Sequence, residues 1–358
     1  MGAARGVLAS PFGRRVGPLA AGSFWCMAQC ALRAGQWLDP LFFPSLRAPV
    51  IDRPVVIAGL PRTGTTFLQR WLHDAGVGTG QELWRILCPS STLQALAKPL
   101  VPWLEPLSPT RLHPPEIHRS GLQEVEADDA SLFLHHLDGF FLYGFLLAHA
   151  DEDLRSWIDS RDRDTSGRDY AWLRACWARN LASTGGTRVL AKLFSAGGDI
   201  PALLRAFPDA KVIYTQRDPR ECIPSAMSLL TSVLDANLGY SSLPAASKQR
   251  YLDRIYAALV ELMRRFHEDW SSGAFPREQV FLLPHHRLRT DFEETMHSLL
   301  AWLEHPLDGS MQERIRKQAE RQAARSSAHR YSLSEYGLDE AAILRDCADW
   351  MQPSAAPG

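Results

Sequence analysis

The stretch VVIAGLPRTGTT, residues 55–66, decides the fold of this chain. The apolar run over residues 54–58 is typical of a buried strand, and Gly59 and Gly64 keep the GxxxxG spacing of a phosphate-binding turn. Glycines let the backbone curl so that its N–H groups converge on an anion, and a following helix adds the positive end of its dipole. The sequence therefore predicts a strand, an anion-binding turn and a helix that opens near Thr65.

One position in this turn differs from the pattern of nucleotide hydrolases. That pattern places Lys directly after the second glycine, whereas this chain has Thr65 there and carries its cation inside the turn as Arg62. Thr65 and Thr66 add hydroxyl donors. The turn is therefore expected to bind a ligand with one anionic group held beside a bidentate cation, and a nucleoside triphosphatase is disfavoured.

Three further short apolar runs have the character of buried strands: 188–193, 211–215 and 279–283. Helical patterns lie between or after the strands: 65–73, 199–206, 219–230 and 251–270. Strands that alternate with helices predict parallel βαβ units. We therefore expect an α/β fold, a P-loop-like three-layer domain whose central, mostly parallel sheet is flanked by helices.

The third run ends in a second cationic turn, Arg217-Asp218-Pro219-Arg220. Proline suits the first turn of a helix, so a helix is expected from Pro219, with Ser225 two turns into it. An arginine at the carboxyl end of a strand faces the crevice in which α/β folds bind ligands. Arg217 and Ser225 are therefore candidates to hold a second, separate phosphate.

The rest of the chain divides into less regular stretches. Residues 89–115 are rich in proline and predict an irregular excursion, residues 126–150 are apolar with a helical rhythm, and residues 151–169 predict a charged, exposed connection. We expect residues 1–50 to be a helical extension packed on a main domain of residues 51–340, with a tail over 341–358. The first 38 residues contain four arginines and no acid, so a targeting signal and a surface helix over about 22–37 both remain open.

The composition excludes a mainly disordered chain, a collagen-like repeat and a coiled coil. The chain has 358 residues, is 46% hydrophobic and 22% charged, and has a formal net charge of −1, as in ordinary globular proteins. The balanced charge argues against nucleic acid as a partner, and no apolar run is long enough to span a membrane. The six cysteines have no CxxC spacing and predict reduced thiols in a cytoplasmic protein. A homo-oligomer remains open.

The two cationic turns together resemble the sulfotransferase family, which uses 3′-phosphoadenosine 5′-phosphosulfate (PAPS). Residues 60–66 are similar to its 5′-phosphosulfate loop, and Arg217 with Ser225 to its 3′-phosphate site. The similarity is greatest to the bacterial-type branch, which is related to the tyrosylprotein sulfotransferases. That branch also has a strand ending in lysine, here Lys192, a Phe-Pro-Asp-Ala-like turn at 207–210, and a tail like residues 329–338.

The resemblance implies transfer of a sulfuryl group from PAPS to a hydroxyl or amine of a small-molecule acceptor, by in-line displacement and without a metal. It implies Arg62 and Lys192 as the cations that stabilise the transition state. The residues it implies for binding the nucleotide are Pro61, Arg62, Thr63, Gly64, Thr65, Thr66, Arg217 and Ser225.

The acceptor also needs a base, and three candidates remain open. Tyrosylprotein enzymes use a glutamate a short way after the loop, and Glu82 lies in a comparable place beside apolar Leu83 and Trp84. His135 and His136 are the alternatives, since histidine titrates near neutral pH, and His285 and His286, which follow a strand, are weaker candidates. A P-loop-type kinase and a non-catalytic nucleotide-binding protein are the alternative functions.

Overall fold

The computed structural model describes residues 18–108, 121–324 and 333–351. By its contacts the chain divides into two compact units that interleave along the sequence. Unit 1 comprises Met1–Asp52, Thr79–Val189 and Met227–Ala258, and unit 2 comprises Arg53–Gly78, Leu190–Ala226 and Leu259–Gly358. Unit 2 contains the sheet and both cationic turns.

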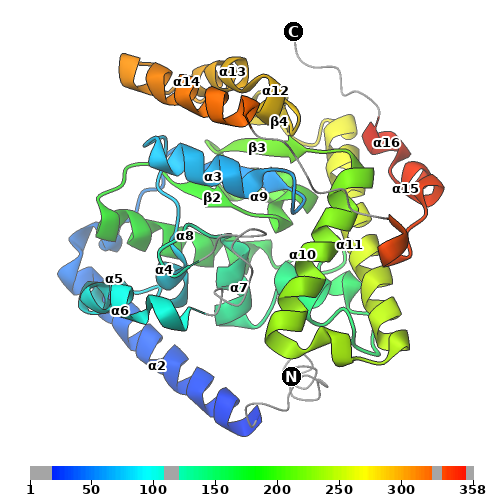
Figure 1. Cartoon of the computed structure of the whole chain (residues 1–358). Coiled ribbons are helices and arrows are strands. Elements are labelled where there is room, and N and C mark those ends of the chain that lie inside the picture. Colours follow the sequence, from blue (N-terminus) through cyan, green and yellow to red (C-terminus); the bar gives the residue numbers. More distant parts are fainter. Residues whose placement is uncertain (1–17, 109–120, 325–332, 352–358) are drawn as a thin grey trace. The chain divides into compact units, whose positions relative to one another are not determined.

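The sheet of unit 2 has four parallel strands in the order β2-β1-β3-β4 (Figure 1). The strands are β1 (Val55–Gly59), β2 (Leu190–Lys192), β3 (Lys211–Gln216) and β4 (Val280–Pro284). Every residue of β1 is buried, which explains the absence of an alternating polar pattern in its sequence. The four strands predicted from the sequence are confirmed, with ends shifted by one or two residues.

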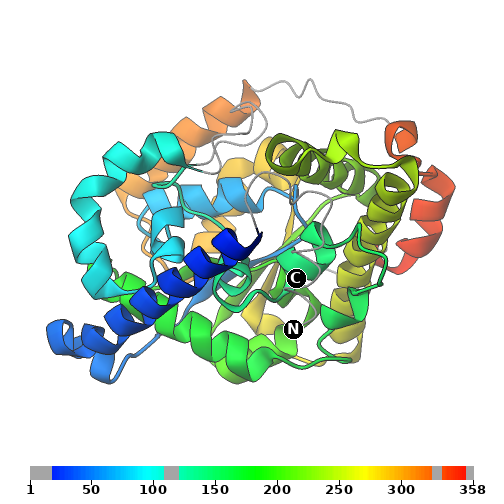
Figure 2. The ribbon, with the colours of Figure 1, turned by 90° about the horizontal axis from the view of Figure 1, so that it is seen from below.

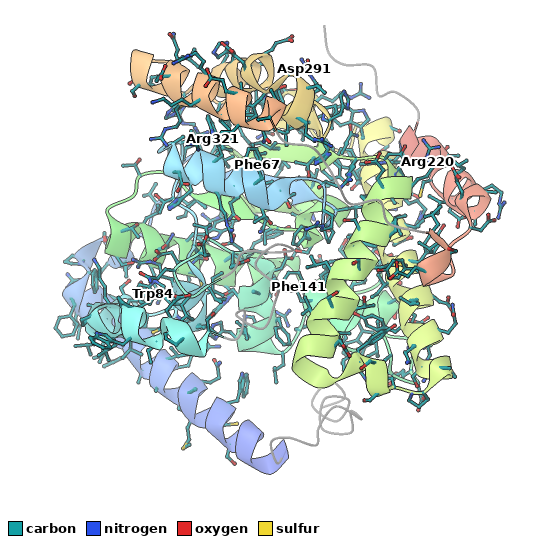
Figure 3. The ribbon with its side chains drawn as sticks, in the orientation of Figure 1. Phe67, Trp84, Phe141, Arg220, Asp291 and Arg321 are labelled. Atoms are coloured by element: carbon teal, nitrogen blue, oxygen red, sulfur yellow. The ribbon has the colours of Figure 1, made fainter. Side chains whose placement is uncertain are left out.

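One face of the sheet packs against helices from two parts of unit 2. These are α3 (Thr65–Asp74), α12 (Arg287–Thr290), α13 (Phe292–Trp302) and α14 (Gly309–Ala323). Val55 and Ile57 of β1 share one buried cluster with Leu68 of α3 and Met296 of α13. The ring of Phe67, labelled in Figure 3, meets that of Phe292 edge-on at 6.0 Å.

The opposite face is covered by a second layer of helices. Tyr214 of β3 stacks on Phe266, with ring centroids 3.5 Å apart, and Phe266 belongs to α11 (Ala245–Ser272). A Cβ on Gly197 would lie 3.3 Å from the Tyr214 ring, so the short helix η7 (Ser195–Gly198) also contacts this face. Layers on both faces of an all-parallel sheet confirm the predicted α/β, P-loop-like fold.

The other helices of unit 2 are α9 (Ile200–Ala206), η9 (Arg277–Gln279), η10 (Leu333–Tyr336), α15 (Glu340–Asp346) and α16 (Ala348–Met351). Helix α10 (Pro219–Leu238) begins in unit 2 and ends in unit 1. Arg220, in its first turn, pairs with Asp218 and with Glu340 of α15, and Figure 3 shows it between these two helices.

The described residues of unit 1 form helices and no named strand. They include α2 (Pro18–Phe42), η1 (Pro44–Arg47), α4 (Leu83–Leu87), α5 (Ser91–Ala97), η2 (Lys98–Leu100), α6 (Val101–Leu104), η3 (Glu105–Leu107), α7 (Asp129–His136), the π-helix η5 (Phe141–Leu146), η6 (Arg155–Trp157), α8 (Ser166–Thr184) and η8 (Tyr240–Ser242). In the parts of the chain that the structure describes, no helix is both long and apolar enough to cross a membrane.

Two sequence-based expectations for unit 1 are wrong. The proline-rich stretch 89–115 is helical over residues 91–107, and its residues 109–120 lie outside the described ones. Pro99, Pro102 and Pro106 occupy first-turn positions of η2, α6 and η3, where a missing N–H costs nothing, so they start helices instead of preventing them. The helix α8 was not expected, because it begins with the charged residues of the predicted connection 151–169.

A fully buried carboxylate joins three helices of unit 1. Asp39 of α2 accepts hydrogen bonds from Arg179 Nε of α8 at 2.7 Å, from Ser90 Oγ at 2.9 Å and from the Thr92 backbone N–H at 2.8 Å. Burial by itself would raise the pKa of Asp39, but these hydrogen bonds outweigh it and leave the pKa below its ordinary value. The carboxylate therefore stays ionised and holds α2, α5 and α8 together.

We predict that Asp39→Ala lowers the free energy of unfolding by about 3 kcal/mol, because it leaves the largely buried Arg179 without its carboxylate. Urea unfolding followed by circular dichroism measures this. Glu313→Ala, which removes an exposed partner of Arg316 on α14, is the control and should cost far less, because solvent screens an exposed pair. Equal losses in the two variants would show that Asp39 does not join the helices.

Candidate active site

The turn after β1 is shaped by close contact with β3. Gly59 has φ +125° and lies opposite Thr215 in the strand register. A Cβ on Gly59 would come within 2.5 Å of Thr215 Oγ1 and 2.6 Å of its carbonyl oxygen. Only glycine therefore fits at the point where the strand becomes the turn.

Side-chain contacts inside unit 2 fix the middle of the turn. Thr63 is buried, and its Oγ1 lies 2.6 Å from both the Leu60 carbonyl oxygen and Thr215 Oγ1. Arg62 adopts φ +71° and Gly64 φ +90°, so the chain reverses before α3 begins at Thr65. A non-glycine residue in this region is strained, and such strain gathers at functional sites. Sequence reasoning missed Thr215, whose only signal was its place at the end of a strand.

The two cationic anchors touch each other. Arg62 Nε donates to Ser225 Oγ at 3.0 Å, and Arg217 Nη1 donates to the carbonyl oxygen of Arg62 at 2.9 Å. Arg217 is also ion-paired with Glu221 one turn along α10. Residues predicted separately, more than 150 positions apart in sequence, therefore form one cationic cluster at the carboxyl ends of β1 and β3.

Lys192 ends β2 at the same edge of the sheet. Only 2% of its surface is exposed, and its Nζ donates to Thr66 Oγ1 at 3.1 Å in the first turn of α3. The β1–β2 register places it opposite Ile57, two residues before the turn. The structure thus brings Lys192 to the turn, as well as Arg62, Arg217 and Ser225.

His285 follows β4 and packs against the turn. Its backbone N–H donates to the Gln216 carbonyl oxygen, and a Cβ on Gly64 would lie 3.1 Å from its ring carbon Cδ2. Burial, followed by the positive charges of Arg217 and Arg289, lowers the pKa of His285 to about 4. The ring is therefore neutral at pH 7 and adds a hydrogen-bonding group without adding charge. Sequence reasoning had noted it only as a weak candidate.

Glu82 belongs to unit 1, at the start of α4. Its Oε2 accepts hydrogen bonds from Trp84 Nε1 and Arg85 Nε, both at 2.8 Å, and its side chain is 30% exposed. Arg85 is itself held by Gln94 and Ser183. The carboxylate is therefore fixed in direction while remaining accessible to solvent.

The two alternative bases, also in unit 1, differ in their partners. His135 is buried, with Nε2 2.7 Å from the Ile86 carbonyl oxygen and Nδ1 3.2 Å from Gln29 Nε2. The Nε2 atom of His136 is buried and has no hydrogen-bond partner among the described residues. Burial lowers the pKa of both imidazoles. His135 therefore has a structural role in joining α7 to α4, whereas His136 keeps a nitrogen unused.

The described residues contain no group of three or more His, Cys, Asp or Glu side chains that could hold a metal ion. The charges gathered around the turn are side-chain cations, as an anionic ligand requires.

From the low pKa of His285 we predict how the free energy of unfolding depends on pH. The unfolded chain binds a proton on this residue below about pH 6.5, whereas the folded protein does so only near pH 4, so stability falls as the pH drops between these values. We expect His285→Gln to lose less stability than the unmodified protein between pH 7 and pH 5, by on the order of 2 kcal/mol, in urea unfolding. His286→Gln, at the exposed neighbouring residue, is the matched control. An unchanged pH dependence in His285→Gln would contradict the burial of a neutral ring.

The chain resembles solved structures over nearly its whole length. It is similar to the crystal structure of sulfotransferase STF9 from Mycobacterium avium, with 20% identity, a TM-score of 0.71, and coverage of 95% of this chain and 85% of that one. It is also similar to sulfotransferase STF1 from Mycobacterium tuberculosis H37Rv, with 20% identity, a TM-score of 0.66, and coverage of 92% and 85%. At these identities the likeness shows the fold. No curated protein sequence matches the chain.

A family model gives the stronger result. The model of the sulfotransferase family matches residues 54–309, which is more than half of the chain and includes both cationic turns, Lys192 and Glu82. Together with the parallel sheet and the cationic cluster at its carboxyl edge, this match identifies the protein by class: the chain belongs to the sulfotransferase family.

Proposed function

We propose that this sulfotransferase takes its sulfuryl group from PAPS and transfers it to a hydroxyl or amine of a small-molecule acceptor. The observation that carries the proposal is the direct contact between the two anchors, through Arg62, Ser225 and Arg217. A donor with a 5′-phosphosulfate and a 3′-phosphate carries its two anionic groups on one nucleotide, so it needs two cationic sites that lie close together. The contacts within unit 2 supply that arrangement.

The residues at the turn fit such a donor in charge and in hydrogen-bonding type. The backbone N–H groups of the first turn of α3, with Thr65 and Thr66, suit the 5′-phosphosulfate, because a helix N-terminus stabilises an anion. Arg217 and Ser225 suit the 3′-phosphate, one as a guanidinium and the other as a hydroxyl donor. Pro61, Thr63 and Gly64 are proposed to hold the shape of the loop.

Catalysis in this proposal is electrostatic. PAPS supplies the sulfuryl group, and charge builds on the bridging oxygen when the sulfur–oxygen bond breaks. Arg62 offers a bidentate guanidinium inside the loop, and Lys192 offers a buried ammonium beside Thr66. Both are preorganised by their contacts with Ser225 and Thr66, and a cation held in place before reaction stabilises developing negative charge without reorganisation.

We propose Glu82 as the base that takes the proton of the acceptor. Arg85 and Trp84 bond to one carboxylate oxygen, Oε2, so the carboxylate keeps a fixed orientation and its second oxygen has lone pairs for a proton. His135 is a weaker candidate, because both of its ring nitrogens are engaged. His136 is the alternative, since its Nε2 has no partner in the described part of the chain.

The remaining expectations stay proposals. The family match over 54–309 lies within the catalytic domain that we propose over 51–340, with an extension before it and a tail over 341–358. All six cysteines are free thiols, which supports a reducing, cytoplasmic location. The relation to the tyrosylprotein sulfotransferases remains a prediction, and residues 329–332 of the matching tail lie outside the described residues.

The cofactor proposal predicts a difference between two nucleotides. Adenosine 3′,5′-bisphosphate should raise the melting temperature, because a ligand that binds only the folded state stabilises it. Adenosine 5′-monophosphate lacks the 3′-phosphate and should raise it much less. Thermal-shift measurements at equal nucleotide concentration test this.

The matched control for this measurement is Ser225→Ala, which removes a hydroxyl proposed to contact the 3′-phosphate. It should reduce the shift with the bisphosphate by more than it reduces the small shift with the monophosphate. Equal shifts with both nucleotides in the unmodified protein would contradict a 3′-phosphate site at Arg217 and Ser225, and transfer of label from radioactive ATP but not from labelled PAPS would replace the function by phosphotransfer.

The base proposal predicts the effect of two substitutions, each of which removes one candidate base. Glu82→Gln keeps the shape of the side chain but removes its basic oxygen, so turnover with PAPS should fall by ~10²–10⁴ while bisphosphate binding changes little. His136→Gln should keep most of the turnover. The opposite ranking of the two variants, with both shown to be folded, would assign the base to His136.

A further inference from the structure

Helix α2 of unit 1 carries its polar side chains inward. Asp39 is fully buried in its contacts with α5 and α8, Gln36 Nε2 donates to the Pro89 carbonyl oxygen, and Gln29 contacts His135. Trp25 Nε1 donates inward as well, to the Leu134 carbonyl oxygen. A surface helix normally turns a mainly apolar face to the core, whereas on α2 polar side chains share the inward face with the half-buried Leu32 and Leu38.

The outward face of α2 includes an uncharged stripe. The stripe consists of Ser23, Met27, Cys30, Ala34, Trp37 and Leu41, all of them exposed, and the exposed Cys26, Ala31, Arg33 and Phe42 lie beside it. The exposed fractions of its large side chains are 65% for Met27, 78% for Trp37 and 62% for Leu41. Figure 2 shows α2 in dark blue. The stripe spans residues 23–41 of this helix. A contiguous apolar surface of this kind marks an interaction site.

The spacing of the stripe indicates that its partner is another helix. Its six positions follow one another at steps of four, three, four, three and four residues, which is the a/d spacing of a coiled-coil seam. In such a seam, each side chain of one helix inserts into a gap between side chains of the second helix. A membrane surface imposes no such step.

The stripe is also complementary to itself. Its members lie nine, five and two residues on either side of Leu32. In an antiparallel pair with a two-fold axis at that point, Ser23 therefore faces Leu41, Met27 faces Trp37, and Cys30 faces Ala34. Small residues meet at the centre and a small residue meets a large one at each end, so two copies of the helix can approach closely. A two-fold interface needs this kind of self-complementary surface.

The charge beside the stripe agrees with such a pairing. Arg33 is the charged residue beside the stripe; it lies over the ring of Trp172 in its own unit and would face Ala31 of the second copy, so like charges do not meet. Met27, Trp37 and Leu41 supply roughly 450 Å² per copy at roughly 150 Å² for each side chain. A stable complex buries about 800 Å² per partner, so the seam supplies about half of it and a further apolar contact is required.

A second apolar surface of unit 1 can extend this contact. Leu96, Leu100 and Trp103, on α5, η2 and α6, are 69%, 56% and 82% exposed. Helix α5 starts beside the C-terminal part of α2, where Ser90 donates to Asp39. Both apolar surfaces therefore belong to one compact unit.

We propose that this protein is a homodimer in which α2 packs antiparallel against α2 of a second copy, with the two-fold axis near Leu32. The proposal is independent of the sulfotransfer reaction, because every residue that carries it lies in unit 1 and away from the cationic cluster of unit 2 in the chain.

Sedimentation equilibrium of the full chain tests the pairing. We expect a mass of about twice 40.0 kDa for the unmodified protein, and a dissociation constant raised at least ~100-fold by Ala34→Glu, since each dimer then places two carboxylates in an apolar seam. Ser45→Glu, an exposed substitution on η1 outside the stripe, is the control and should remain dimeric. Unchanged circular dichroism shows that each variant is folded.

A cross-linking experiment tests the register without weakening the contact. Ala34→Cys places a thiol opposite Cys30 of the second copy, so mild oxidation should give a covalent dimer, and adding Cys30→Ser should abolish this cross-link. Three results would overturn the proposal: a monomeric unmodified protein, a dimer that Ala34→Glu leaves intact, or a monomer that floats with phosphatidylglycerol vesicles through the stripe, which would make a membrane the partner.

Discussion

The close approach of the Gly59 backbone to Thr215 is the constraint on which the cationic site depends. A parallel pairing of β1 with β3 brings these residues so close that no side chain fits at position 59. The turn that follows is then fastened by Thr63 to Thr215, and its reversal places the Arg62 carbonyl within reach of Arg217. One backbone approach therefore positions both anion anchors before any ligand is present, and preorganisation of this kind is what electrostatic catalysis requires.

The cluster concentrates positive charge while limiting its repulsion. Arg62 and Arg217 lie together, yet Arg217 is paired with Glu221, and His285 beside them is neutral because burial and its cationic neighbours lower its pKa. A third full charge at His285 would oppose the other two in the free protein. Instead, the imidazole fills space against Gly64 and leaves the net positive charge to residues that are proposed to meet phosphate or sulfuryl oxygens.

Unit 1 shows how a polar network can free a helix surface for another purpose. Asp39, Gln36 and Gln29 fasten α2 inward by directed hydrogen bonds, so its outward apolar residues are not needed for its own attachment. Met27, Trp37 and Leu41 remain outside as a seam. The polar side of the helix therefore supports the fold, and the apolar side supports the assembly that we propose.

The sequence alone determined the four strands, the anion-binding turn and the identity of its cations, because these depend on local patterns: an unbroken apolar run, glycine spacing, and an arginine at a strand end. It did not determine the helices over 91–107, where prolines that look like breakers start new helices, nor α8. Whether Glu82, His135 or His136 takes the proton also lay beyond it, since a partner such as the Ile86 carbonyl oxygen, which occupies Nε2 of His135, lies 49 residues away in the sequence. Only the tertiary structure decided that Arg62 touches Ser225, that Thr215 fastens the turn, and that His285 is neutral, because contact and burial between residues far apart in sequence follow from the pairing of strands and leave no local pattern to read.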